Sequence, residues 1–216
     1  MHFEYSPEPE DRSKFTEGYN TFYSRFATVY DWVIKVLPIW RNWLNTAHPW
    51  IQGPRVLEAS FGTGYLLTQC AGQFETYGID LNQRLANIAK DNLRQSGLRA
   101  SLQVANVELL PYADESFDTV INTMAFTGYP DGQWAFAEIS RVLKPGGRIV
   151  MVDINYPCDG NKVGTILTKG WKAGGDIIRD VPELFERFGY EYTDREVGGY
   201  GSVHLYVATK PGLGEA

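Results

Sequence analysis

The sequence predicts an α/β domain built on a doubly wound, mostly parallel β-sheet. From Gly53 onward, short runs rich in β-branched residues alternate with segments whose apolar residues recur at helical spacing. Repeated units of this kind place parallel strands in one sheet and helices on both of its faces. The chain has 216 residues, of which 44% are hydrophobic and 21% charged, and this suits a single domain with a sizeable core.

The first 50 residues differ in character and predict an N-terminal arm with a helical cap, which leaves 51–216 as the α/β domain. Residues 1–17 are polar and contain Pro7 and Pro9, which predicts a loose arm. The segment 18–50 carries aromatic and apolar residues at helical spacing, and Pro38 divides it into a long helix and a short one over 39–45. Because four of the six tryptophans lie in this segment, we expect it to pack on an apolar surface as a lid over the sheet.

The elements of the α/β part follow in order. Strands are predicted at 55–59, 76–79, 101–105, 117–121 and 148–152. Between them, helices are predicted at 65–71, from the N-cap Asn82 to Gly97, and at 131–143. Residues 155–180 predict a long loop with one helix, followed by a short helix at 182–188. Strands at 191–197 and 203–209, joined by a glycine-rich connection, predict an antiparallel hairpin at one sheet edge.

Charge and cysteine content exclude several classes of protein. Lys and Arg total 20 and Asp and Glu total 26, giving a net charge of -6 and no basic footprint for nucleic acid. Cys70 and Cys158 are far apart and have no His or Cys at ligand spacing, which predicts neither a disulfide scaffold nor a metal site. Acidic residues occur among the first 30 positions, where a signal peptide would have an apolar stretch. We therefore expect a cytoplasmic protein.

The sharpest motif is the turn that follows the first predicted strand. In Val56–Gly64 a strand ends, the carboxylate of Glu58 appears, and Gly62 and Gly64 permit a tight turn into a helix. Glycines at such a place let backbone N–H groups approach a ligand, and open α/β sheets bind ligands at the carboxyl ends of their strands. The alternative interpretation is an ordinary strand–helix connection.

A second carboxylate strengthens the ligand hypothesis. Asp80 ends the next strand, where an acid can accept both hydroxyls of a ribose, although it could also serve only the start of a helix. A dinucleotide fingerprint needs a third glycine, whereas Leu67 stands at that position and no P-loop lysine follows. A nucleoside without phosphates therefore fits better than a nicotinamide dinucleotide.

These motifs belong to a longer pattern, whose segments in order are Val56–Gly64, Tyr77–Asp80, Val104–Tyr112, Asp114–Asp118 and Arg141–Gly147. The pattern resembles that of the class I S-adenosylmethionine-dependent methyltransferases. Its last two segments are similar to the small-molecule branch that includes ubiquinone and menaquinone biosynthesis methyltransferases. The resemblance implies a Rossmann-like seven-stranded sheet and S-adenosyl-L-methionine as cofactor.

The resemblance also implies a set of cofactor contacts. Glu58 corresponds to the acid near the methionine amino group, and Asp80 to the ribose ligand, with Leu81 packing on the adenine. Adenine is faced by Asn106, in place of the usual Asp, and by the backbone N–H of Val107. Ser60 stands where the first glycine of the loop is usual. The other implied contacts are Gly62, Gly64, Asn122 and Thr123.

Methyl transfer from a sulfonium needs alignment and exclusion of water more than acid–base help. Accordingly, the sequence shows no catalytic motif, and the candidates for a catalytic side chain are His204, Tyr23, Tyr30 and Asp153. We expect a methyltransferase acting on a small, apolar or aromatic acceptor, as a monomer or homodimer. A nicotinamide oxidoreductase, a nucleic-acid or protein methyltransferase and a non-catalytic cofactor-binding protein remain as alternatives.

The aromatic segment also permits contact with a membrane surface. In this hypothesis Trp32, Trp40 and Trp43, together with Lys35 and Arg41, lie flat on the lipid.

Overall fold

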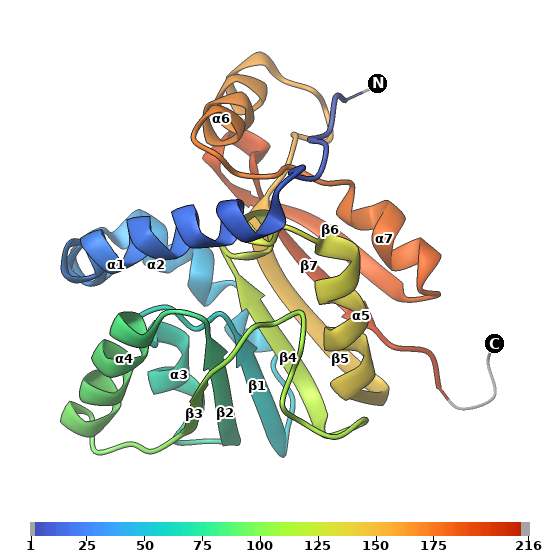
Figure 1. Ribbon diagram of the computed structural model, residues 1–216. Helices are drawn as coiled ribbons and strands as arrows, with labels where there is room; N and C mark the ends of the chain where they lie inside the picture. The colour runs from blue at the N-terminus through green and yellow to red at the C-terminus, as the bar shows by residue number, and fades with distance from the viewer. Residues whose placement is uncertain (1–2, 213–216) are drawn as a thin grey trace.

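A seven-stranded sheet forms the centre of the protein, in the order β3-β2-β1-β4-β5-β7-β6 (Figure 1). The computed structural model describes residues 3–212, apart from the side chains of Tyr30, Val33, Ile34 and Lys35. Adjacent strands are parallel except β7, which runs antiparallel to both β5 and β6. The strands are β1 Arg55–Ala59, β2 Glu75–Asp80, β3 Ser101–Val104, β4 Phe117–Thr123, β5 Leu143–Ile154, β6 Glu191–Gly198 and β7 Val203–Thr209.

The central strands are buried on both faces, which explains their continuous apolar runs. In β5, the four residues Ile149–Val152 are all fully buried. Strand order reverses between β1 and β4, and such a reversal leaves a crevice at the carboxyl ends of the strands. The predicted fold class, including the antiparallel hairpin at one edge, is confirmed.

Helices cover both faces of the sheet. Side chains of α5 and α7 belong to the apolar cluster on one face, whereas those of α2, α3 and α4 pack on the other. Several of these helices begin at a side-chain cap, as in α4, where Asn82 accepts hydrogen bonds from the N–H groups of Arg84 and Leu85. The helices are α1 Arg12–Val36, α2 Pro38–Asn45, α3 Tyr65–Cys70, α4 Gln83–Gln95, α5 Gly132–Val142, α6 Lys162–Ala173 and α7 Val181–Arg187, with 3₁₀ turns η1 His48–Trp50, η2 Phe126–Gly128 and η3 Gly199–Gly201.

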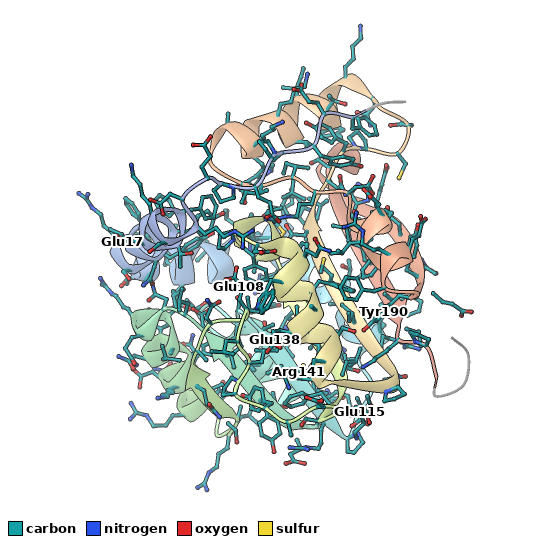
Figure 2. All side chains as sticks on the ribbon, turned by 45° about the vertical axis from the view of Figure 1, so that its right-hand side comes forward. Glu17, Glu108, Glu115, Glu138, Arg141 and Tyr190 are labelled. Carbon is teal, nitrogen blue, oxygen red and sulfur yellow. The ribbon has the colours of Figure 1, made fainter. Side chains whose placement is uncertain are left out.

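The segment between β3 and β4 has no regular structure and is held by α5. Arg141 donates to the carbonyl oxygens of Leu110 and Tyr112, at 3.0 and 2.8 Å, and to Glu138. Glu138 in turn accepts from the N–H of Leu110 at 2.8 Å. Figure 2 shows Arg141 and Glu138 together on α5. This ion pair, in which Arg141 lowers the pKa of Glu138, fixes the connection that carries residues 105–107 to the end of the sheet.

Over the described residues 3–17, the prediction of a loose arm is wrong, whereas residues 1 and 2 of that prediction lie outside the described part of the structure. Helix α1 already begins at Arg12, and the residues before it pack on distant parts of the chain. The ring of Phe3 stacks on Tyr156 with centroids 4.8 Å apart, and the N–H of Ser6 donates to the carbonyl of Ile178 at 2.7 Å. The partners lie some 150 or more positions away in sequence, so local polarity did not reveal them.

The tryptophans of the cap do not share one exposed face. Trp40 lies 5.7 Å from Trp43 and 6.1 Å from Trp171 between ring centroids, and both Trp40 and Trp43 pack against core clusters. Trp32 alone of the three is largely exposed, at 61%. The flat arrangement of tryptophans expected for lipid contact is therefore not formed, because the rings of Trp40 and Trp43 pack against α6 and the sheet. Within residues 3–212, the helices are too short or too polar to cross a bilayer.

One buried carboxylate, Asp153 near the end of β5, organises the turn after β4. It accepts hydrogen bonds from the N–H groups of Ala125, Phe126 and Ile154 at 2.6 to 3.1 Å. Burial raises the pKa of Asp153 to about 6, with a smaller contribution from Asp176. Asp153, which the sequence analysis gave as a catalytic candidate, thus binds backbone N–H groups.

We expect Asp153→Ala to lower the free energy of unfolding by about 2–4 kcal/mol, because buried N–H groups lose a charged acceptor. Urea denaturation measures the change, with the exposed Asp91→Ala on α4 as the matched control. Equal stability of the two variants would contradict this structural role.

Candidate functional site

A cavity lies between α1 and the carboxyl ends of β1, β2 and β4, where Figure 1 shows α1 running across one end of the sheet. It encloses about 830 Å³ of empty space, counting the part open to solvent. Its wall consists of Thr16, Tyr19, Asn20, Tyr23, Ser60, Gly62, Asp80, Leu81, Asn82, Leu85, Ala105, Asn106, Val107, Thr123, Met124, Ala125, Gly128, Tyr129 and Pro130.

The glycine-rich turn forms one end of this wall. Gly62 and Gly64 have φ of 56° and 78°, in the left-handed region that favours glycine. A Cβ at Gly64 would also lie 2.9 Å from the Cβ of Ala89. The backbone of the turn therefore favours both glycines, and the close packing on α4 also requires Gly64.

Ser60 also adopts a left-handed conformation, with φ of 63°. This explains why glycine is usual at its position, and the structure shows what compensates for the serine. Its Oγ lies 2.7 Å from the hydroxyl oxygen of Tyr129, which in turn accepts from Nδ2 of Asn122 at 2.7 Å. Asn122 is fully buried and supports the wall from behind rather than lining it. Sequence reasoning missed Tyr129, since nothing in the chain links it to the turn 69 residues earlier.

Asp80 lies at the centre of the site. Its carboxylate accepts hydrogen bonds from the N–H groups of Gly62 and Asn82, both at 2.8 Å. Burial nevertheless raises the pKa of Asp80 to about 6. The next side chain, Leu81, is 39% exposed and lines the same cavity. The acid and the apolar surface that the sequence assigned to ribose and adenine are thus adjacent.

A second carboxylate lies deeper. Glu58 is 3% exposed, and its Oε2 has no hydrogen-bond partner. Burial, and then the charge of Asp80, raise the pKa of Glu58 well above its usual range. It borders a small recess that shares Ser60, Gly62 and Thr123 with the main cavity. A buried carboxylate oxygen without a partner indicates a missing donor.

The far end of the wall is formed by residues 105–107. The Oδ1 of Asn106 accepts from the N–H of Glu108 at 3.0 Å and so shapes the turn in which Val107 is buried. Met124 follows β4 with a left-handed φ of 52° and lines the cavity beside Thr123.

Helix α1 closes the cavity and is fastened to α4. Nδ2 of Asn82 donates to the carbonyl of Asn20 at 3.0 Å and to Oγ of Ser24 at 2.7 Å. Tyr19 donates from its hydroxyl to Asp176 at 2.9 Å. The aromatic spacing of this helix predicted that one of its faces is packed. Tyr19 and Asn20 reach the site because α1 is docked in this way, which the spacing did not show.

The four catalytic candidates are distributed differently. Tyr23 lines the cavity, and burial raises its pKa to about 12. Tyr30 lies in α1, but its side chain is outside the described part of the structure. Neither Asp153 nor His204 lines the cavity. His204 is buried in β7, with its ring nitrogens near Asp194 and the carbonyl of Tyr156.

Comparison with known proteins agrees with this geometry. Residues 57–151 match the model of a methyltransferase domain. A ubiquinone/menaquinone biosynthesis C-methyltransferase UbiE from Geobacter sulfurreducens is 28% identical over 152 residues, which cover 65% of this chain and 59% of that protein. An uncharacterized protein from Mycobacterium tuberculosis is 37% identical over 109 residues, 50% of this chain and 39% of its own. The chain spans 59% to 67% of the length of the first UbiE relatives.

Two solved structures share the fold. The [4+2]-cyclase SpnF superimposes with a TM-score of 0.75 over 96% of this chain and 100% of its own, at 19% identity. An N-methyltransferase from Haemonchus contortus, in complex with S-adenosylhomocysteine, has a TM-score of 0.70 at 16% identity, over 94% of this chain and 61% of that one. Residues 57–151 thus match a methyltransferase domain, and the fold is the Rossmann-like fold of S-adenosylmethionine-dependent methyltransferases. Several of the relatives are named ubiquinone/menaquinone biosynthesis C-methyltransferases.

S-adenosylmethionine is the cofactor implied, and the residues present fit it. The molecule joins an adenosine to a sulfonium and an amino acid. An acid beside an apolar surface suits a ribose and its base, as at Asp80 and Leu81. A buried carboxylate oxygen without a partner suits an ammonium group, as at Glu58.

We expect Asp80→Asn to weaken S-adenosylmethionine binding by about 1–3 kcal/mol, or roughly 5- to 150-fold in Kd, because charged hydrogen bonds become neutral ones. Calorimetric titration measures it, with Asp91→Asn as the matched control. A second variant, Gly62→Val, should abolish binding by filling the turn. If both site variants bind like the wild type, the site is elsewhere.

Binding should also depend on pH. In the free protein Asp80 has a pKa of about 6, and a cationic ligand with hydroxyl donors favours its ionised form. Its pKa therefore falls on binding, so affinity is greatest above pH 6 and decreases as pH falls through that value, by roughly tenfold per unit. Titrations between about pH 5 and 8 test this, and a flat profile in the wild type would be the contrary result.

Proposed function

We propose that this protein transfers a methyl group from S-adenosylmethionine to a small apolar or aromatic acceptor. The observation that carries the proposal is the shape of the cavity. It joins the turn at Gly62 and Asp80 to an aromatic wall of Tyr19, Tyr23 and Tyr129. A cofactor-binding end and an acceptor-binding end thus share one space beneath α1.

The individual residues have distinct roles in this proposal. Asp80 binds the ribose, Leu81 and Val107 hold the base, and Glu58 receives the amino group. Gly62 and Gly64 let the turn approach the cofactor. Thr123 and Met124, at the end of β4, border the place where the methyl group meets the acceptor.

When bound, S-adenosylmethionine supplies an activated methyl group and a neutral leaving group. The protein then has to align the acceptor and exclude water. Burial and Asp176 strongly raise the pKa of Tyr19, so its hydroxyl stays protonated and positions the acceptor instead of deprotonating it. Among the described residues, the cavity wall has no His, Lys or Glu, which favours an acceptor that needs no general base in the protein.

The relatives support an aromatic acceptor. Several are named as C-methyltransferases of ubiquinone and menaquinone biosynthesis, and quinone precursors are aromatic rings. A ring between Tyr19, Tyr23 and Tyr129 would gain stacking or edge contacts.

A second candidate function is cofactor binding without methyl transfer, since SpnF, with the same fold, is named a cyclase. The two functions are separated by incubating the protein with S-adenosylmethionine and a panel of small aromatic acceptors. Formation of S-adenosylhomocysteine with a methylated product supports the proposal. Tight binding with no product from any acceptor supports the alternative. Binding of NAD in preference to S-adenosylmethionine would contradict both.

The position of Tyr19 can be tested without touching it. A Cβ at Gly128 would lie 2.7 Å from Cε1 of the Tyr19 ring, whereas a Cβ at Gly170 meets nothing within 4 Å. We expect Gly128→Ala to displace the ring and lower kcat/KM for the acceptor about tenfold or more, and Gly170→Ala to leave it unchanged. Steady-state kinetics measure both, and equal values would exclude Tyr19 from the acceptor site.

A further inference from the structure

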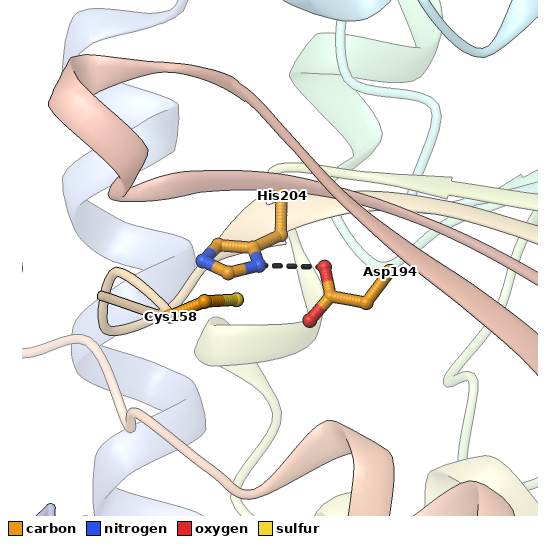
Figure 3. A group of neighbouring side chains, drawn as sticks. All are labelled: Cys158, Asp194 and His204. Atoms are coloured by element: carbon orange, nitrogen blue, oxygen red, sulfur yellow. Dashed lines mark hydrogen bonds and ion pairs between the residues drawn. The ribbon is translucent and has the colours of Figure 1, made fainter. Parts of the chain in front are cut away.

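Three side chains of different chemistry meet on the hairpin side of the sheet, away from the cofactor cavity. They are Cys158, in the loop after β5, Asp194 in β6 and His204 in β7 (Figure 3). One ligand atom from each, a thiol sulfur, a carboxylate oxygen and a ring nitrogen, can be chosen so that all lie within 4.8 Å of one another. None of the three lines the cofactor cavity.

Strand pairing creates this group. His204 lies directly opposite Glu196 in the antiparallel register of β6 and β7, and Asp194 precedes Glu196 by two residues on the same face. Cys158 is held against this face by its backbone N–H, which donates to Oε1 of Glu196 at 2.5 Å. Spacing along the sequence could not show the group, because its members come from three segments.

The hydrogen bonds of His204 leave one nitrogen in an unusual position. Nε2 lies 3.0 Å from the carbonyl oxygen of Tyr156, which can only accept, so Nε2 carries a proton. In the neutral ring Nδ1 then carries a lone pair, yet it faces Oδ1 of Asp194 at 2.7 Å. Two acceptor atoms at that distance share a second proton, and a metal ion can take the place of that proton once the two atoms move apart.

We propose that Cys158, Asp194 and His204 bind a single zinc ion or another transition metal of the same class. Sulfur, nitrogen and oxygen donors together suit zinc. A ring N–H held by a backbone carbonyl, as at Nε2, is the usual support of a metal-binding histidine. Cys158 is exposed, which provides a route of entry, and the carboxylate of Glu196 beside it, or a water molecule, completes four ligands.

The geometry requires only small adjustments. Zinc–ligand distances of about 2.0–2.3 Å place tetrahedral ligand atoms roughly 3.3–3.8 Å apart. The Asp194–His204 contact at 2.7 Å has to open slightly and the widest separation of 4.8 Å has to close by about 1 Å. On binding, the Cys158 thiol loses its proton to solvent, and a sulfur–zinc bond takes the place of the S–H bond. The proton shared by His204 and Asp194 also leaves to solvent, so one metal ion displaces two protons.

The proposed ion would act as a clamp. It would join the loop after β5, which also carries Tyr156, the residue on which Phe3 stacks, to the β6–β7 hairpin. Because the site does not reach the cavity, we expect it to stabilise the fold of the hairpin side and not to take part in methyl transfer.

Cobalt substitution tests the proposal on the full chain. Protein freed of metal with a chelator is titrated with Co²⁺, and a sulfur-to-cobalt charge-transfer band should reach its limit at one equivalent. The band should disappear in Cys158→Ala and persist in Cys70→Ala, the matched control at the other, buried cysteine. His204→Gln should weaken zinc binding more than about tenfold, since even outer-shell partners carry about 10- to 100-fold, whereas His48→Gln should not.

Zinc should also raise the melting temperature of the wild type but not that of Cys158→Ala. Circular dichroism verifies the fold of each variant, and Asp194→Asn takes the place of His204→Gln if the latter is unfolded. Absence of the cobalt band in the wild type, its persistence in Cys158→Ala, or zinc affinity that is unchanged in the histidine or aspartate variant would overturn the proposal. In that case the cation between His204 and Asp194 is a proton.

Discussion

The site depends on the buried carboxylate of Asp80 at the end of β2. One of its oxygens accepts the N–H of Gly62 and the other accepts the N–H of Asn82, so it joins the glycine-rich turn to the start of α4. Asn82 in turn holds α1 through Asn20 and Ser24. A single acid thereby connects the turn, a neighbouring helix and the helix that closes the cavity. The same acid remains exposed to the cavity that it organises.

The electrostatics of the site favour the same cofactor as the fold does. Two carboxylates, Glu58 and Asp80, are buried near each other, and burial raises the pKa of both. Removing them from water without a compensating cation costs free energy. A ligand that brings an ammonium and a sulfonium supplies that compensation, whereas a phosphate-bearing ligand would add repulsion. The charge of the site thus favours the same cofactor as the fold, by an independent physical argument.

Packing explains how the glycine-rich turn tolerates a departure from the family pattern. Ser60 occupies a left-handed position that glycine would adopt more easily, and the hydroxyl of Tyr129 compensates. The ring of Phe61, in the same turn, fills the space above Gly78, where a Cβ would collide with it. The turn therefore keeps its shape through side-chain contacts with other segments, which compensate for the backbone freedom that a glycine would have given.

Sequence periodicity was sufficient to predict the succession of strands and helices along the chain, because burial on one face or on both leaves a local pattern of apolar residues. The turn at Gly62 and the acid Asp80 were likewise visible, since a tight turn and the end of a strand each require particular residue types. Only the tertiary structure decided which side chains close the cavity, why Asp153 serves the backbone, and that His204 meets Asp194 and Cys158. Such contacts join residues far apart along the chain, and their partners are set by strand order and helix docking, which leave no local pattern to read.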